Sequence, residues 1–314
     1  MAITKLLLLL AIGLGAMVNH AGGREPVFRF LVVGDLPYSD EEEVQFRRLL
    51  KQSEQDDFAF LMHVGDTKAQ NAPCSDETYQ KTRGLMRNYP KPVVYTLGDN
   101  EWTDCHHSGG DPIERLDRLR ELFFQDGGVL RLQKFAAKHQ SDDPQFARFI
   151  ENYRFTKSGV LFIAVHVCGS DNNRRPEDPA AMEEFADRNA ANLAFLKESL
   201  AEAVNHKTVG VVIAMHADLK FKSRHAEGFH DTIAAMEDFA ANYPEPIVCI
   251  HGDTHFFRVD NPLTDDAGHQ THLHFTRMEV FGAPNVAGVS VTVDPQDPQV
   301  FSFRPYFLRT AEGG

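Results

Sequence analysis

The segment RFLVVGD, residues 29–35, is a run of apolar residues that stops at Gly34 and Asp35. Three further segments have the same form: AFLMHVGD at 59–66, VVYTLGD at 93–99 and IVCIHGD at 247–253. Short continuous apolar runs are typical of strands buried on both faces of a sheet, and a glycine permits a sharp turn at the strand end. The chain is therefore expected to contain several buried strands that leave the sheet through a Gly-Asp turn.

Apolar runs and helical periodicities extend this pattern along the chain. Strands are predicted at 27–33, 58–64, 93–97, 160–167, 209–215 and 247–250. Leucines at helical spacing predict a long helix over about 182–205, and a second amphipathic stretch lies at 113–123. After Asp253 the pattern changes to alternating strands, around 273–275, 289–293 and 300–303, separated by Asn-Pro, Ala-Pro and Asp-Pro dipeptides. An α/β first part followed by a β-rich tail predicts a sheet sandwich flanked by helices.

Length and composition predict one large globular domain, because 314 residues with 42% hydrophobic content can bury a substantial core. Residues 1–21 differ from the rest, since Lys5 precedes an apolar run at 6–18 that is typical of a signal peptide and short for a membrane span. A retained membrane anchor is the alternative, because the region around Asn19 has no clear small-x-small cleavage pattern. We therefore expect a signal peptide at 1–21, a single domain at 22–314, export to the periplasm or medium, and no membrane span after signal removal.

The charge and the cysteines restrict the partners and the compartment. A formal charge of −13 without a basic stripe argues against a nucleic-acid-binding surface. In an exported chain Cys74 and Cys105, both in polar loops just beyond Gly-Asp segments, are expected to form a disulfide. Cys168 and Cys249 lie in or beside apolar runs, where a buried free thiol is the expectation.

The four strand-end carboxylates could converge, because ligand sites of α/β sheets lie outside the carboxyl ends of the strands. A fifth predicted strand, VGVVIAMH, ends at His216, and His255 follows two residues after Asp253. Several carboxylates in one pocket would repel one another, and bound divalent cations remove this conflict. Mixed Asp and His ligands suit Mn, Zn or Fe, and the oxygen-rich balance also admits Mg. A helix N-cap remains the ordinary role for any one of these aspartates taken singly.

At this point the sequence resembles the calcineurin-like metallophosphoesterase superfamily, which includes purple acid phosphatases. The ordered blocks run from Asp35 to His255: Gly65-Asp66 resembles the second block, Gly98-Asp99-Asn100-Glu101 the third, His216 the fourth and Gly252-Asp253-Thr254-His255 the last. The resemblance implies a four-layer αββα sandwich with two mixed β-sheets flanked by helices. It also implies two divalent or trivalent metal ions, Mn, Fe, Zn or Mg, that activate water for attack on a small phosphorylated substrate.

The resemblance further implies two ligand sets that share Asp66. The first set would be Asp35, Asp66, His255 and Tyr38, because GDLPY places Tyr38 three residues after Asp35, similar to the Asp-x-x-Tyr pair of purple acid phosphatases. The second set would be Asp66, Asp99 or Asn100, His216 and Asp253.

The sequence departs from the family pattern at three places: Pro37 stands where the first block has His, Asp99-Asn100 where the third has Asn-His, and Asp253 where the last has His. Because Asn100 replaces the usual proton donor, His106 is the expected general acid or phosphate contact, with His107 as second choice. Taken alone, each is more often an ordinary polar loop residue. The expected function is hydrolysis of phosphate mono- or diesters, and the alternative is a weak or inactive relative that binds metal or a phosphorylated ligand.

Other residues near these blocks have two readings each. His63 and His251, inside predicted strands, are expected to make supporting hydrogen bonds rather than bind metal. Lys68 and Arg258 could contact phosphate, although lone cations are more often solvated. Trp102 could stack on a substrate or pack within its loop.

Overall fold

The computed structural model describes residues 25–221 and 226–309. The expected signal peptide at 1–21 lies outside the described residues. Within the described parts of the chain, no helix is sufficiently long and apolar to cross a membrane.

The first sheet has five strands in the order β12-β11-β1-β2-β3. Strands β1, β2 and β3 are parallel, β11 pairs with β1 in the antiparallel direction, and β12 pairs with β11 in the same way. Their bounds are Phe28–Val33 for β1, Leu61–His63 for β2, Val93–Tyr95 for β3, Ala287–Val293 for β11 and Phe301–Phe307 for β12.

The second sheet has seven strands in the order β4-β5-β6-β7-β8-β10-β9. Strands β6, β7, β8 and β10 are parallel, and the outer strands run antiparallel to their neighbours. Their bounds are Lys138–His139 for β4, Tyr153–Lys157 for β5, Val160–Ala164 for β6, Gly210–Ala214 for β7, Ile247–His251 for β8, Arg258–Asp260 for β9 and Phe275–Glu279 for β10.

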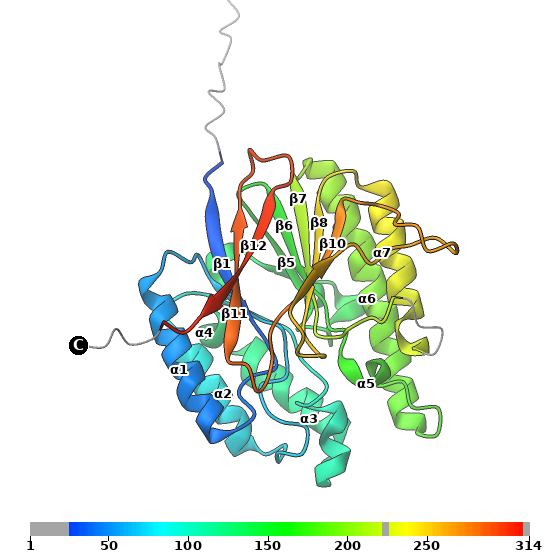
Figure 1. Ribbon diagram of the computed structural model, residues 1–314. Coiled ribbons are helices and arrows are strands. Elements are labelled where there is room, and N and C mark those ends of the chain that lie inside the picture. Colours follow the sequence, from blue (N-terminus) through cyan, green and yellow to red (C-terminus); the bar gives the residue numbers. More distant parts are fainter. Residues whose placement is uncertain (1–24, 222–225, 310–314) are drawn as a thin grey trace, which may run out of the picture.

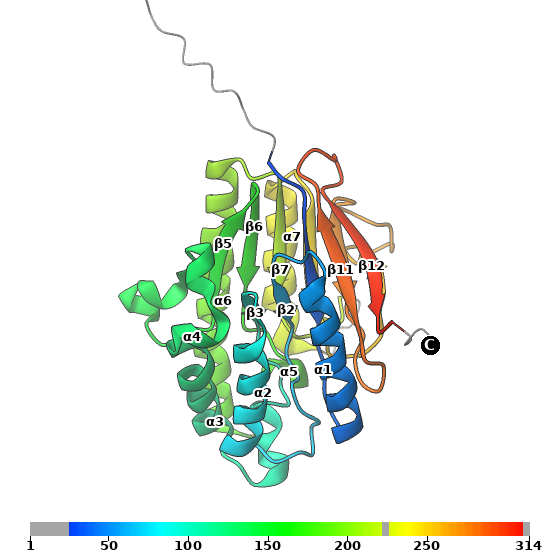
Figure 2. The same cartoon turned by 90° about the vertical axis from the view of Figure 1, so that its left-hand side faces the viewer.

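The two sheets pack face to face between two layers of helices, which confirms the predicted αββα sandwich (Figure 1). Helices α1 and α2 cover the first sheet, as the view from their side shows (Figure 2), and α6 and α7 cover the second. The bounds of the helices are Asp40–Gln55 for α1, Asp76–Asn88 for α2, Pro112–Leu119 for α3, Gly127–Leu130 for α4, Gly169–Asn172 for α5, Pro179–His206 for α6 and His230–Asn242 for α7.

Side-chain alternation explains why the second sheet is buried on both faces. On β6, Phe162 points into the core between the sheets, where its ring centroid lies 5.5 Å from that of Phe30 on β1. Its neighbours Leu161 and Ile163 instead belong to the core under α6 and α7. Because successive side chains of a strand point to opposite faces, a strand between two cores must be apolar throughout.

The long helix α6 begins where the local sequence favours a helix start. Asp178 caps α6 by accepting from the backbone N–H groups of Ala180 and Ala181, and Pro179 occupies the first turn, where no donor is needed. Ser39 caps α1 in the same way, so Tyr38 is fixed one residue before the helix cap.

Several predicted bounds were wrong by a few residues. The strands predicted at 58–64 and 160–167 are limited to β2 and β6, although backbone hydrogen bonds continue beyond both strands, from Val64 N–H to the Val33 carbonyl and from Val165 N–H to the Ala214 carbonyl. The amphipathic stretch at 113–123 is helical only to Leu119 and continues as a π-helical turn, Arg120–Gln125. Strand β5 was not predicted, because its sequence YRFTK mixes apolar and charged residues. Leu273 lies outside β10 and is 67% exposed.

Candidate metal centre

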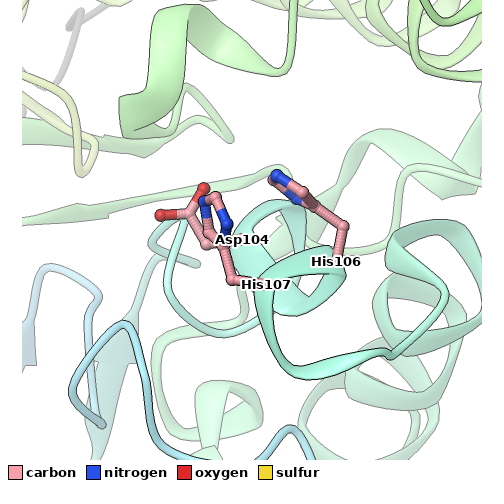
Figure 3. Close-up of side chains that lie close together, drawn as sticks. All are labelled: Asp104, His106 and His107. Atoms are coloured by element: carbon pink, nitrogen blue, oxygen red, sulfur yellow. The ribbon is translucent and has the colours of Figure 1, made fainter.

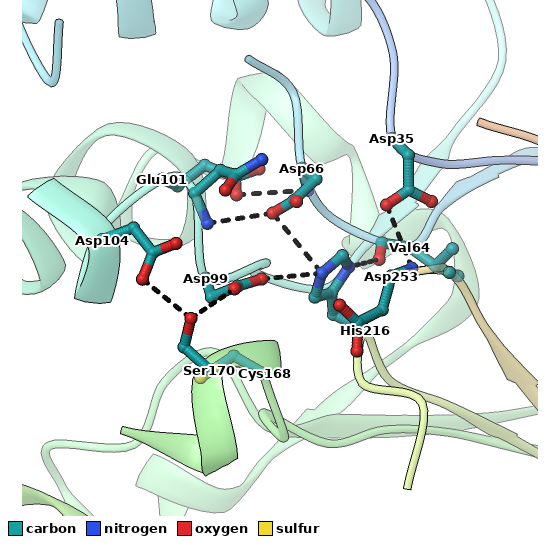
Figure 4. Close-up of polar contacts among 12 residues, drawn as sticks. Asp35, Val64, Asp66, Asp99, Glu101, Asp104, Cys168, Ser170, His216 and Asp253 are labelled. Atoms are coloured by element: carbon teal, nitrogen blue, oxygen red, sulfur yellow. Dashed lines mark hydrogen bonds and ion pairs between the residues drawn. The ribbon is translucent and has the colours of Figure 1, made fainter. Parts of the chain in front are cut away.

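The polar residues at the ends of five parallel strands meet at one edge of the sandwich (Figure 4). Strands β1, β2 and β3 of the first sheet lead to Asp35, Asp66 and Asp99. Strands β7 and β8 of the second sheet lead to His216 and Asp253. The convergence follows from topology, because the carboxyl ends of parallel strands lie at the same edge.

Left-handed backbone conformations recur at these strand ends. Asp35, Asp66 and Asp253 have φ values of 53°, 54° and 83°, and His255 has 64°. A positive φ is uncommon for residues other than glycine, and such conformations cluster at functional sites because the surrounding structure enforces them. The surrounding fold therefore holds these residues in backbone conformations that they do not prefer locally, and these conformations set the positions of their side chains.

Two glycines allow the first sheet's loops to approach one another closely. Gly65 has φ +94°, and a Cβ there would lie 2.7 Å from both the backbone nitrogen of Gly98 and Nδ1 of His216. A Cβ on Gly98 would lie 2.0 Å from Oδ1 of Asp66. The Gly-Asp pattern thus serves close packing of the strand ends as well as turning.

His216 lies at the middle of the cluster and is fully buried. Its Nδ1 is 2.8 Å from the carbonyl oxygen of Val64, so Nδ1–H donates there and Nε2 is left as the acceptor in the neutral ring. That Nε2 lies 2.9 Å from Oδ1 of Asp99 and 3.4 Å from Oδ1 of Asp66. Acceptors that face one another at this range require a proton or a cation between them.

Tyr38 and His255 form the more open side of the centre. The Tyr38 hydroxyl donates to Oδ2 of Asp66 at 3.0 Å and lies 3.3 Å from Nε2 of His255. His255 Nδ1 lies 2.7 Å from the carbonyl oxygen of Ala283, which again directs Nε2 inward, 3.6 Å from Oδ1 of Asp35. A backbone bond to one ring nitrogen that orients the other is the usual arrangement of a metal-binding histidine.

Asp253 is held between the two sheets. Its backbone N–H donates to Oδ1 of Asp35 at 3.0 Å, and its Oδ2 accepts from the backbone N–H of Asp218 at 2.9 Å. These contacts tie the last block of the sequence to the first.

The electrostatics of the cluster reflect buried like charges. Burial raises the pKa of Asp35 to about 8 and raises that of Asp66 well above its usual value, with neighbouring carboxylates adding to both effects. Burial acts to raise the pKa of Asp99 too, but contact with His216 outweighs it and that pKa lies below its usual value. Burial acts to lower the pKa of His216, but Asp66 and the other carboxylates raise it well above the usual value.

The side chains fit a metal centre. Among the described residues, no hydrogen-bond partner reaches the buried atoms Asp35 Oδ2, Asp99 Oδ1 and His216 Nε2. Buried polar atoms are nearly always paired, and carboxylate oxygens with an imidazole nitrogen are ligands for divalent cations. Two groups have ligand atoms within 4.8 Å of one another: Asp35, Asp66 and His216, and Asp99, His216 and Asp253. The residue common to both groups is His216, whereas the sequence suggested Asp66 as the shared ligand.

Asn100 lies inside the centre but has no proton to transfer. Its backbone N–H donates to Oδ1 of Asp66 at 3.0 Å, and its side-chain amide donates to the Tyr38 hydroxyl at 3.0 Å and to the Lys68 carbonyl at 3.1 Å. It therefore orients two of the candidate ligands.

His106 lies on the 3₁₀ turn Thr103–Ser108, beside the centre rather than in it. Its Nδ1 is 2.7 Å from the carbonyl oxygen of Thr103, and the ring is exposed. Figure 3 shows it near His107 and Asp104, and ligand-type atoms of the three lie within 4.8 Å of one another. Asp104 reaches the centre indirectly, because the Ser170 hydroxyl bridges it to Asp99 with contacts of 2.8 Å to each carboxylate.

Sequence reasoning missed three supporting residues. Glu101 accepts from the backbone N–H groups of Asp66 and Thr67 at 3.1 and 2.8 Å. Ser170 bridges two carboxylates, as described above, and Glu279 accepts from the backbone N–H of Thr254 at 3.1 Å. Glu279 ends strand β10, so the strand-end rule would have found it had it included Glu, whereas Ser170 lies in α5, well beyond the end of β6.

The remaining candidate residues make structural contacts. Trp102 is fully buried with the Arg188 guanidinium 5.2 Å from its ring, so it packs within the fold. The expectation that Lys68 is solvated was wrong, because it is 3% exposed and donates to the carbonyls of Ala69 and Ala72. Arg258 is paired with Asp218 and Glu279.

His63 and His251 are buried, with ring nitrogens 3.2 and 2.8 Å from the backbone carbonyls of Leu36 and Gly252.

Cys74 and Cys105 form the expected disulfide, which joins the loop after Asp66 to the turn after Asp99. Cys168 and Cys249 are buried free thiols, also as expected, and burial raises the pKa of both.

Fold and site together define a class of proteins: α/β sandwiches in which strand ends of two sheets present carboxylates and imidazoles to a common centre. Within that class the sequence matches the calcineurin-like phosphoesterase family over residues 28–257, and the chain belongs to this family. No curated protein sequence gives a significant match.

Solved structures with the same fold include two phosphatases and PhoD. A dimetal phosphatase from Danio rerio has a TM-score of 0.53 and 14% identity, covering 90% of this chain and 99% of the other. PhoD has a TM-score of 0.55 and 12% identity, covering 93% and 74%. A purple acid phosphatase from yellow lupin (Lupinus luteus) seeds has a TM-score of 0.50 and 16% identity, covering 90% and 54%. At these identities the likeness concerns the fold.

Proposed function

We propose that this protein is an exported phosphoesterase that hydrolyses phosphate mono- or diesters with two bound metal ions. The observation that carries the proposal is the convergence of four strand-end aspartates and two inward-directed imidazoles, several of whose buried ligand atoms have no other partner among the described residues. When bound, the cations supply activation of water and neutralisation of phosphoryl charge.

The residues that would hold the cations are drawn from the candidate ligands described above. Asp35, Asp66, His255 and Tyr38 would serve the more open position, and Asp99, His216 and Asp253 the more enclosed one. Burial raises the pKa of Tyr38, so its phenol stays protonated and donates to Asp66 unless a cation takes the oxygen. The mixed oxygen and nitrogen set suits Mn, Fe, Zn or Mg.

His106 is the proposed general acid or phosphate contact, with His107 second. The exposure of His106 and the bond from its Nδ1 to Thr103 support this role, because Nε2 remains free for a substrate oxygen.

A second candidate function is a weak or inactive relative that binds metal or a phosphorylated ligand. The observation that favours it is Asn100, whose amide is engaged with Tyr38 and Lys68 and cannot act as an acid at the position where the family carries histidine.

Export and a single mature domain at 22–314 belong to the same proposal. The disulfide supports export, because structural disulfides persist in oxidising compartments.

Metal analysis combined with turnover tests the two functions. The purified protein is loaded with Mn, Fe, Zn or Mg in separate samples, its metal content is measured, and hydrolysis of a generic aryl phosphate monoester and diester is followed. Two bound ions with turnover support the phosphoesterase, whereas bound metal without turnover of any ester supports the binding protein. Absence of stoichiometric metal in every sample would contradict the metal-dependent phosphoesterase and would leave only the binding of a phosphorylated ligand.

A further inference from the structure

A hollow of about 580 Å³ adjoins the candidate metal centre on the side of His255. This aromatic pocket, as we call it, is formed chiefly by His255, Phe256, Phe281, Val286 and Phe307. These residues come from the turn after β8, the loop after β10 and the end of β12. Its size is in the range of small-molecule sites, about 300–1,000 Å³.

The pocket and the centre share a wall. His255 lines the pocket, and its Nε2 faces Asp35 and Tyr38 in the centre. The loop that carries Phe281 is tied to the same imidazole, because the carbonyl oxygen of Ala283 lies 2.7 Å from Nδ1 of His255. A molecule bound on the open side of the centre would therefore have the pocket beside it, across the His255 imidazole.

Most of the residues that line the pocket are apolar or aromatic. The ring of Phe281 is stacked on that of Phe257 at 4.7 Å and lies 5.7 Å from that of Phe307. Among the described residues that line it, none is Asp, Glu, Lys or Arg, and the polar ones besides His255 are the amides Gln45 and Asn285. Phe256 and Phe307 are 71% and 59% exposed. Grouped exposed apolar side chains beside a polar site are typical of ligand-binding grooves.

A second hollow, on the Tyr38 side, differs in that charged side chains take part in its lining. It measures about 220 Å³ and is lined by charged residues that include Asp40, Glu43 and Lys81. An apolar group is therefore directed to the aromatic pocket by the cost of displacing water from charged side chains on the other side.

We propose that the aromatic pocket binds an uncharged apolar group, aromatic or saturated, on the alcohol part of the phosphoester whose phosphate lies at the metal centre. This inference rests on the proposed phosphoesterase function and names its substrate class. A second phosphate or carboxylate is disfavoured there, because the pocket wall offers no Lys or Arg among the described residues.

Three esters with similar primary-alkyl leaving groups test the inference: ethyl, 2-phenylethyl and 2-cyclohexylethyl phosphate, each assayed with the metal-loaded full chain. Leaving-group chemistry is then nearly constant, so differences in kcat/KM report contacts with the pocket. We expect the two bulky esters to exceed ethyl phosphate by about tenfold or more. Preference for phenyl over cyclohexyl identifies an aromatic group, and equal preference identifies a general apolar one.

Phe256→Ala and Phe307→Ala should each reduce this preference by about tenfold, mainly through a higher KM for the bulky esters. Leu273→Ala is the matched control, because Leu273 is also exposed but lies outside the pocket lining, and it should retain the wild-type preference. Equal kcat/KM for all three esters, with no effect of either phenylalanine variant, would overturn the inference while the proposed function stands.

If no ester is hydrolysed, the proposed function fails instead. The role of the pocket is then tested by ligand binding. Calorimetry with ethylphosphonate and 2-phenylethylphosphonate, which are not hydrolysed, should then show tighter binding of the phenyl compound, reduced in Phe307→Ala. Equal affinities of the two phosphonates would overturn the inference.

Discussion

Nε2 of His216 lies 2.9 Å from Oδ1 of Asp99, although Asp99 follows a strand of the first sheet and His216 follows a strand of the second. The candidate metal centre therefore spans the interface of the sandwich. A cation bound by both residues would join the two sheets, so its binding and the packing of the sheets should stabilise each other.

Asp66 is the first test of the centre, because its two oxygens contact Asn100 and Tyr38 and it faces His216. Asp66→Ala should abolish turnover and lower metal content below two ions per chain, measured by elemental analysis. The variant should still fold, since removal of a buried carboxylate relieves repulsion, and circular dichroism checks this. Retention of two tightly bound ions would contradict the assignment of Asp66 as a ligand.

His106 is tested by its effect on esters with poor leaving groups. Loss of a general acid costs about 10²–10⁴ in rate, so His106→Ala should slow alkyl-ester hydrolysis at least a hundredfold with metal content unchanged. The effect should be smaller for an aryl ester, whose leaving group needs little protonation. His107→Ala, the second candidate on the same turn, is measured in parallel and should have the smaller effect. Near wild-type alkyl-ester turnover in His106→Ala would exclude the role.

The buried pair of Arg120 and Glu151 predicts a pH-dependent stability. Their contacts are 2.9 and 2.6 Å, and both side chains are buried. Burial acts to raise the pKa of Glu151, but Arg120 and His166 outweigh it, so this pKa lies below its usual value. The folded protein therefore binds fewer protons than the unfolded chain, and this contribution is present above pH of about 4.3 and is lost as pH falls further.

Glu151→Gln should accordingly lower the free energy of unfolding by about 3–5 kcal/mol at pH 7, because it leaves the Arg120 charge buried without its partner. The difference from wild type should shrink in urea titrations below about pH 4. Glu121→Gln is the control, since the same change in an exposed pair with Arg118 should cost less than about 1 kcal/mol. A difference that is constant with pH would contradict the linkage.

The disulfide should stabilise the loops beside the centre. Cys74 and Cys105 are separated by 31 residues, and closing a loop of that size is worth about 2–4 kcal/mol. The double variant Cys74→Ser, Cys105→Ser should lose this amount in urea unfolding, and reductant should have the same effect on the wild type only. Mass mapping without reductant that finds both thiols free would contradict the pairing.

The strand-end aspartates were accessible from sequence because their positions are set locally. Each follows an apolar run that must be buried on both faces, and each stands after a glycine, so strand, turn and carboxylate are adjacent in the chain. The strand boundaries were harder to predict from the sequence, as the short β2 and the unpredicted β5 show. Pairing with neighbouring strands decides where a ladder begins and ends.

The sequence by itself determined the layered α/β architecture, the parallel strands and the residue types at their ends, since hydrophobic periodicity and turn chemistry are properties of short segments. Only the tertiary structure decided that His216 lies among both groups of candidate ligands, that Val64 and Ala283 orient the two imidazoles, and that Ser170, Glu101 and Glu279 support the site. These relationships join loops from different strands and sheets, and their distances depend on how the two sheets pack against each other, which no single segment of the chain encodes.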